Sequence, residues 1–71
     1  MSITTIEGLR ALNDGAHVML YPNAENPLHH KPHEATFAGG LFFVDGSDPA
    51  NGPDYYFRDV FLYNDRIEVI P

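Results

Sequence analysis

The sequence predicts a mainly β protein of the α+β class: a short N-terminal helix followed by a four-stranded antiparallel meander that curls into a small, partly open barrel. Four segments rich in β-branched and aromatic residues are separated by stretches of Gly, Pro, Asn and Asp, which is the pattern of strands and turns. Helical spacing of apolar residues occurs only near the N-terminus. At 71 residues the chain is expected to form a single small domain, residues 1–71, around one core.

The helix is expected from about residue 5 to about residue 13. Thr4 and Glu7 have the spacing of a capping box, in which each side chain caps a backbone N–H group of the first turn. Apolar residues follow on one helical face, at Ile6, Leu9 and Leu12. Because a helix this short is unstable alone in water, the apolar stripe must dock on the rest of the protein.

The first two strands are expected at about residues 16–21 and 34–44. A polar segment containing two prolines separates them and is interpreted as a loop. The Gly39-Gly40 pair falls in the middle of the second strand. Glycines inside a strand often mark a bulge or a bend, so this pair indicates where the sheet curls.

The last two strands are expected at about residues 55–63 and 66–70, with Asn64-Asp65 as a two-residue hairpin turn between them. The stretch DGSDPANGPD, which precedes them, is interpreted as a turn-rich loop. Because the connections are short, consecutive strands are expected to pair antiparallel. In element order and size this outline resembles the small SH3-like barrels, a resemblance that implies a fold and no activity.

Charge argues against one class of partner. Ten acidic residues against four Lys and Arg give a formal net charge of −6. Proteins that bind nucleic acid directly need a basic patch, and here the four cations are scattered along the chain. We therefore expect no direct nucleic-acid binding and instead a basic protein partner.

The sequence carries no apolar run long enough to span a membrane, and MSITTIEGLR lacks the basic and apolar regions of a signal peptide. Cysteine is absent, which excludes disulfides. We expect a cytoplasmic protein without membrane contact. A core of this size supplies about 3–5 kcal/mol, so a homodimer that adds stability remains open.

The stretch PLHHKPHE, residues 27–34, has the most unusual chemistry of the chain. It contains His29, His30, His33 and Glu34. Imidazole and carboxylate groups are ligands for zinc, nickel and copper, and the first and last histidines are four residues apart. A helix through Pro32 would clash, however, and a three-ligand cluster would need a tight loop or help from His17. We therefore expect no metal and no cofactor here, and a polar loop that contacts a partner with histidines titrating near neutral pH.

The second polar loop contributes Asp45, Asp48 and Asp54. Oxygen-rich loops can hold calcium, but this one lacks the alternating ligands and late Glu of an EF-hand, so turn chemistry is the preferred interpretation. Tyr55 and Tyr56 follow directly and are expected to lie partly outside the core, where tyrosine provides rigid contact area.

Catalysis is not expected. No cysteine nucleophile exists, Ser2 and Ser47 lack a GxSxG context, and AGGLF lacks the lysine and spacing of a phosphate-binding loop. A domain of this length also has little room for a substrate pocket.

These observations favour a small, acidic, non-enzymatic protein-binding module, in its sharper form an inhibitor that occupies the basic nucleic-acid-binding site of its partner. In size and charge the chain resembles small acidic proteins of phages and mobile elements, including anti-CRISPR proteins, which implies an anti-defence role. The residues expected to bind the partner are His29, His30, His33, Glu34, Asp45, Asp48, Asp54, Tyr55 and Tyr56.

Two alternatives remain open. One is a metal- or small-ligand-binding domain that uses His17, His29, His30, His33 and Glu34. The other is a self-assembling subunit whose aromatic strand, residues 55–63, pairs edge to edge with a second copy.

Overall fold

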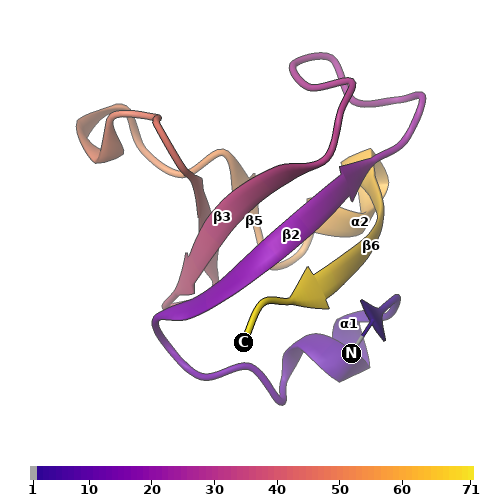
Figure 1. Cartoon of the computed structure of the whole chain (residues 1–71), viewed down its shortest axis with the longest axis vertical. Helices are drawn as coiled ribbons and strands as arrows, with labels where there is room; N and C mark the ends of the chain where they lie inside the picture. The colour runs from indigo at the N-terminus through magenta and orange to yellow at the C-terminus, as the bar shows by residue number, and fades with distance from the viewer. Residues whose placement is uncertain (1) are drawn as a thin grey trace.

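The computed structural model describes residues 2–71 as a curled, six-stranded antiparallel sheet with short helices (Figure 1). The strands are β1 (Ser2–Ile3), β2 (Ala16–Pro22), β3 (His33–Ala38), β4 (Leu41–Val44), β5 (Tyr55–Tyr56) and β6 (Asn64–Val69). The helices are α1 (Ile6–Leu9), the 3-10 turn η1 (Pro49–Asn51) and α2 (Val60–Tyr63). None of these helices has the length and apolar character needed to cross a bilayer.

The spatial order of the strands is β1-β6-β2-β3-β4-β5, with every neighbouring pair antiparallel. Strands β2 to β5 form a meander, and the chain then returns so that β6 pairs with the other side of β2 (Figure 1). The sheet curls into a half-barrel. The mainly β, curled antiparallel outline is thus confirmed, whereas the expected strand number of four and the pairing of the last two strands with each other are wrong.

Helix α1 is shorter than expected. Its N-cap is Thr5, whose Oγ1 accepts a hydrogen bond from the Gly8 amide at 3.1 Å, rather than Thr4. Beyond Leu9 the backbone amides bond three residues back rather than four, which is a 3-10 pattern that seldom extends far. A Cβ atom at Gly8 would lie 2.9 Å from the Cγ2 atom of Ile3, so glycine allows α1 to approach β1 closely.

The predicted strand 34–44 is a hairpin. Gly39 and Gly40 have φ angles of 58° and 81°, and they form the two-residue turn between β3 and β4. Two successive positive φ angles are what tight hairpin turns require, and glycine adopts them without steric strain. The glycine pair therefore reverses the chain instead of bending one strand.

The predicted strand 55–63 is wrong after its first two residues. The Asp59 carboxylate accepts a hydrogen bond from the Tyr56 amide at 2.8 Å, and the Asn64 side chain donates to the Val60 carbonyl at 2.8 Å. Such local side-chain bonds compete with a strand ladder, and here they accompany a turn followed by α2. Asn64 and Asp65 belong to β6, so the predicted hairpin turn at these residues is also wrong.

One face of the sheet, the inner face, holds the core together with the two α-helices. The buried apolar residues are Ile3, Leu9, Val18, Leu20, Ala35, Phe37, Phe42, Val44, Tyr55, Val60 and Ile67. Helix α1 contributes Leu9 and α2 contributes Val60, both fully buried. Neither 4-residue helix is stable on its own, so packing against the sheet holds both in place.

The opposite face of the sheet, the outer face, carries the alternate residues of the strands. These include His17, Met19, Tyr21, Glu34, Thr36, Leu41, Phe43, Tyr56, Arg66 and Glu68. None of them belongs to the buried core.

Replacing Leu9 by alanine is expected to lower the free energy of unfolding by about 2–4 kcal/mol, because a fully buried leucine leaves a cavity between α1 and the sheet. Leu62→Ala is the matched control, since Leu62 also lies in a 4-residue helix but is 63% exposed. Its effect should stay within about 0.5 kcal/mol. Urea unfolding followed by circular dichroism measures both, and equal losses would contradict this account of the core.

Candidate functional site

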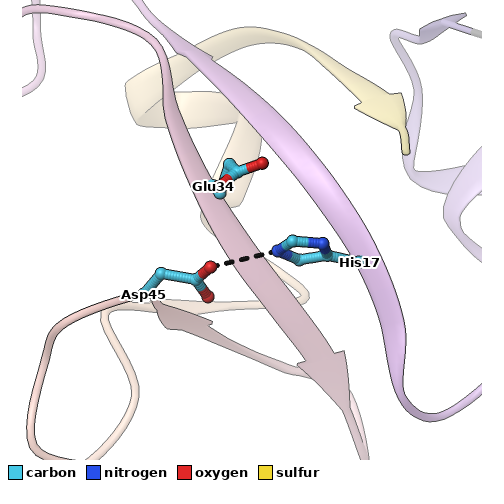
Figure 2. Close-up of side chains that lie close together, drawn as sticks. All are labelled: His17, Glu34 and Asp45. Atoms are coloured by element: carbon cyan, nitrogen blue, oxygen red, sulfur yellow. Dashed lines mark hydrogen bonds and ion pairs between the residues drawn. The ribbon is translucent and has the colours of Figure 1, made fainter. Parts of the chain in front are cut away.

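Three side chains with metal-ligand chemistry meet on the outer face (Figure 2). His17 lies in β2, Glu34 in β3 and Asp45 directly after β4. Their ligand atoms all lie within 4.8 Å of one another. The Nε2 atom of His17 and the Oδ2 atom of Asp45 are 3.1 Å apart, with side chains 41% and 48% exposed. We call these residues the HED cluster.

The sheet register explains why these residues meet. Glu34 pairs with Met19, two positions along β2 from His17, so His17 and Glu34 are diagonal neighbours on the same face. The Asp45 amide donates to the Glu34 carbonyl at 2.9 Å, which continues the β3–β4 ladder by one residue. Backbone pairing therefore sets the positions of all three side chains.

The described part of the surface has two hollows. One, of about 400 Å³, adjoins the HED cluster and is lined by Thr36, Phe43, Val44, Asp45, Gly46 and Ser47. The other, of about 490 Å³, lies by the β3–β4 turn and is lined by Gly39, Gly40, Tyr56, Phe57, Arg58 and Asp59. Both are open to solvent, which distinguishes them from the enclosed pockets that usually bind small molecules.

Beneath the histidine-rich loop lies a buried polar network centred on Asn26, which is 2% exposed. Its Nδ2 atom donates to the Tyr55 hydroxyl at 2.7 Å and to the Tyr63 carbonyl at 3.2 Å. Its Oδ1 atom accepts from the amides of Leu28 and His29 at 3.0 and 2.9 Å. One side chain thus joins the start of the loop to β5 and α2.

His33 continues this network. Its ring stacks on His29 with centroids 4.1 Å apart, and its Nε2 atom lies 3.3 Å from the Tyr55 hydroxyl. Its Nδ1 atom is 3.1 Å from the Lys31 carbonyl, which can only accept, so Nδ1 carries a proton. In the neutral ring Nε2 then accepts from the Tyr55 hydroxyl, which itself accepts from Asn26.

Burial is the largest influence on His33 and lowers its pKa, because desolvation disfavours the charged ring. The bond to the Lys31 carbonyl and the charge of Asp54 act in the opposite direction, while His29 adds to the lowering. Burial likewise raises the pKa of the Tyr55 hydroxyl, against the hydrogen bond from Asn26. Both groups are therefore held in their neutral forms near pH 7.

A second polar group on the outer face joins β1, β2 and β6. The Glu68 carboxylate accepts hydrogen bonds from the Ser2 and Tyr21 hydroxyls at 3.0 and 3.1 Å, and these bonds lower the Glu68 pKa. The Arg66 Nε atom lies 3.4 Å from the same carboxylate. The Arg66 guanidinium also stacks on the Tyr21 ring, 3.8 Å from its centroid. Arg66 is thus already engaged by Glu68 and Tyr21.

The residues expected to bind a partner fall into separate places. The buried network includes His33 and Tyr55, and His29 stacks on the His33 ring. Tyr55 is only 3% exposed, so the expectation that it lies partly outside the core is wrong. His30 and Asp48 are exposed in their loops. Asp54 is half-buried and accepts a hydrogen bond from the Val44 amide. Glu34, Asp45 and the 54%-exposed Tyr56 lie on or beside the outer face.

The residues considered as metal ligands are also separated. In residues 2–71 the three loop histidines form no three-ligand cluster, whereas His17 and Glu34 do so together with Asp45. Asp45 was not among the metal ligands expected from the sequence, because 28 residues separate it from His17. Asn26 was missed as well, although an Asn just before Pro27 is a turn signal that points to side-chain bonding with the following backbone.

Comparisons with protein-family models, with curated proteins and with solved structures found no match to this chain.

The lowered pKa of His33 predicts how stability depends on pH. The unfolded His33 titrates near 6.5 and the folded one below that, so the unfolded chain binds the extra proton first. The free energy of unfolding should fall as the pH drops below about 6.5 and level off below the folded pKa. The lowered pKa of Glu68 also makes the free energy of unfolding depend on pH, but in a more acidic range, because the reference pKa of Glu68 is 4.5.

Chemical unfolding between pH 8 and pH 5 measures this slope. His33→Gln should flatten it, whereas His30→Gln, at an exposed position of the same loop, should leave it unchanged. A slope that persists in full in His33→Gln would show that another group causes it.

Replacing Asn26 by alanine is expected to lower the free energy of unfolding by roughly 1–3 kcal/mol, because it leaves buried partners without hydrogen bonds. Amide exchange at Leu28 and His29 should accelerate, since Asn26 accepts from both. Asn51→Ala, at an exposed position of η1, is the control. Unchanged exchange at these two amides would mean that Asn26 does not anchor the loop.

Proposed function

We propose that this protein is a small, acidic, non-enzymatic module that docks the outer face of its sheet on a basic surface of a partner protein. The observation that carries the proposal is the composition of that face, which combines partly buried apolar side chains with carboxylates that no cation fully compensates.

The apolar part supplies contact area. Met19, Leu41 and Phe43 are half-buried and lie outside the core, and Tyr56 is 54% exposed at the β5 edge. Protein interfaces are typically built from apolar and aromatic residues surrounded by polar ones. Tyrosine is frequent among the residues that contribute most to binding.

The charged part selects the partner. Glu34, Asp45 and Glu68 lie on the outer face, and Arg66 is the only Lys or Arg at a strand position of that face among the described residues. Arg66 is engaged by Glu68 and Tyr21, which leaves Glu34 and Asp45 to face solvent and, in part, His17. A basic partner surface complements this arrangement, and it would also be attracted from a distance by the net charge of −6.

The sharper form of the proposal is an inhibitor whose carboxylates take the place of phosphates in a nucleic-acid-binding site. The excess of acidic residues and the resemblance in size and charge to small anti-defence proteins of phages, such as anti-CRISPR proteins, support it. The cytoplasmic location and the SH3-like type of the half-barrel belong to the same proposal. The curled sheet and its short hairpin support the SH3-like type, although the sheet has six strands rather than four.

Self-assembly is less well supported. The aromatic segment 55–63 provides only a two-residue strand, β5, and the opposite edge strand, β1, is equally short. Short edge strands offer little backbone for pairing with another copy. A two-fold dimer through the outer face would bring its carboxylates against those of the second copy, which opposes association.

The proposal is tested by capturing the partner from host extract, identifying it by mass spectrometry and measuring the affinity of the purified pair in EDTA. Glu34→Lys/Asp45→Lys should weaken binding about tenfold or more, the equivalent of about 1.4 kcal/mol. Glu25→Lys/Asp65→Lys changes the net charge equally at exposed positions off the outer face and should bind nearly as well as the wild type. Affinity should also fall with added salt.

If both double variants weaken binding equally, the affinity depends on the net charge of the protein and not on the outer face. Salt-independent binding would shift the proposal to aromatic contacts, which Tyr56→Ala tests directly.

A further inference from the structure

We propose that the HED cluster is a binding site for one divalent transition-metal ion of the zinc class. The site lies on strands β2, β3 and the end of β4, and it is separate from the histidine-rich loop that the sequence brings to attention. Its test needs only the metal, so it does not depend on the existence of a protein partner.

The spacing of the donor atoms fits an ion. Two ligands that each lie about 2.1 Å from a tetrahedral zinc ion are about 3.4 Å from one another. The Nε2 atom of His17 and the Oδ2 atom of Asp45 are 3.1 Å apart, and all three donors lie within 4.8 Å. The strand register already holds the three Cα positions, so closing the site calls for side-chain rotations rather than a change of the backbone (Figure 2).

The electrostatics of the site also point to a cation. Glu34 and Asp45 are cross-strand neighbours on one face, and like charges in such positions destabilise a sheet. Among the described residues Glu34 forms no salt bridge, and Asp45 pairs only with His17, which needs a proton to be charged. A divalent ion would neutralise both carboxylates and bind the neutral imidazole.

The donor set selects the type of metal. One imidazole nitrogen and two carboxylate oxygens suit zinc, cobalt or nickel, whereas calcium and magnesium prefer oxygen ligands alone. Three protein ligands leave a coordination position open. The hollow lined by Thr36, Phe43 and Ser47 adjoins Asp45, so a water molecule or a small ligand has room to reach that position.

The loop histidines have other roles. Both ring nitrogens of His33 have hydrogen-bond partners, and His29 stacks on the His33 ring. Binding a metal there would break the contacts that join the loop to Tyr55. At the outer-face site a metal would replace only the hydrogen bond between His17 and Asp45, two partly exposed side chains.

Titration calorimetry of the EDTA-treated protein with Zn²⁺ tests the inference, with Co²⁺ absorption as a spectroscopic readout. We expect one ion per chain and a melting temperature raised by about 5 °C or more when the metal is tenfold above Kd. His17→Gln and Glu34→Gln should each abolish the shift. His30→Gln and Asp48→Asn, which are equally conservative and exposed but lie outside the cluster, should retain it.

The metal-free proteins provide an internal check. Glu34→Gln removes a like-charge contact, so its metal-free melting temperature should equal or exceed that of the wild type even though the metal shift is lost. This combination separates ligand loss from a failure to fold.

Three results would overturn the inference: no stoichiometric binding of Zn²⁺ or Co²⁺ to the wild type, a metal shift that survives in both His17→Gln and Glu34→Gln, or a shift that His29→Gln/His33→Gln removes while His17→Gln does not.

Discussion

The register of β2 against its two neighbours, β3 and β6, is the constraint on which the rest of the structure depends. It sets Leu20 opposite Ile67 and Val18 opposite Ala35, so that the apolar residues of three strands line one face. A slip by one residue would move every side chain of β2 to the other face. The same register that fills the core therefore also determines which polar side chains gather on the outer face.

Both proposed activities use the outer face, and both depend on the same two carboxylates. Glu34 and Asp45 would attract a basic partner, and together with His17 they would bind a divalent ion. An ion held there removes negative charge from the surface that the partner would meet. If both activities exist, they are coupled by linkage: each ligand changes the affinity for the other by the same factor.

The inner side of the sheet shows how a small core without disulfides accommodates polar groups. Asn26, Tyr55 and His33 lie in a row of hydrogen bonds that begins at the loop and ends at the Lys31 carbonyl. Because Asn26 makes four hydrogen bonds, its burial is compensated. The histidine-rich loop is thereby attached to the body of the protein at its start, while His30 stays exposed.

Local patterns in the sequence determined the mainly β class, the two long connections and the apolar face of β2, because each depends on a few adjacent residues. They marked Gly39-Gly40 as a bend within one strand, whereas strand pairing makes it the turn of a hairpin. The β propensity of the aromatic segment did not reveal that residues 60–63 form a helix, where the local bonds of Asp59 and Asn64 accompany the burial of Val60 in the core. Tertiary structure alone decided that Tyr55 is buried and that His17 meets Asp45. Contacts between distant residues depend on strand pairing, and pairing follows from the collective burial of apolar side chains, which no single segment of the sequence encodes.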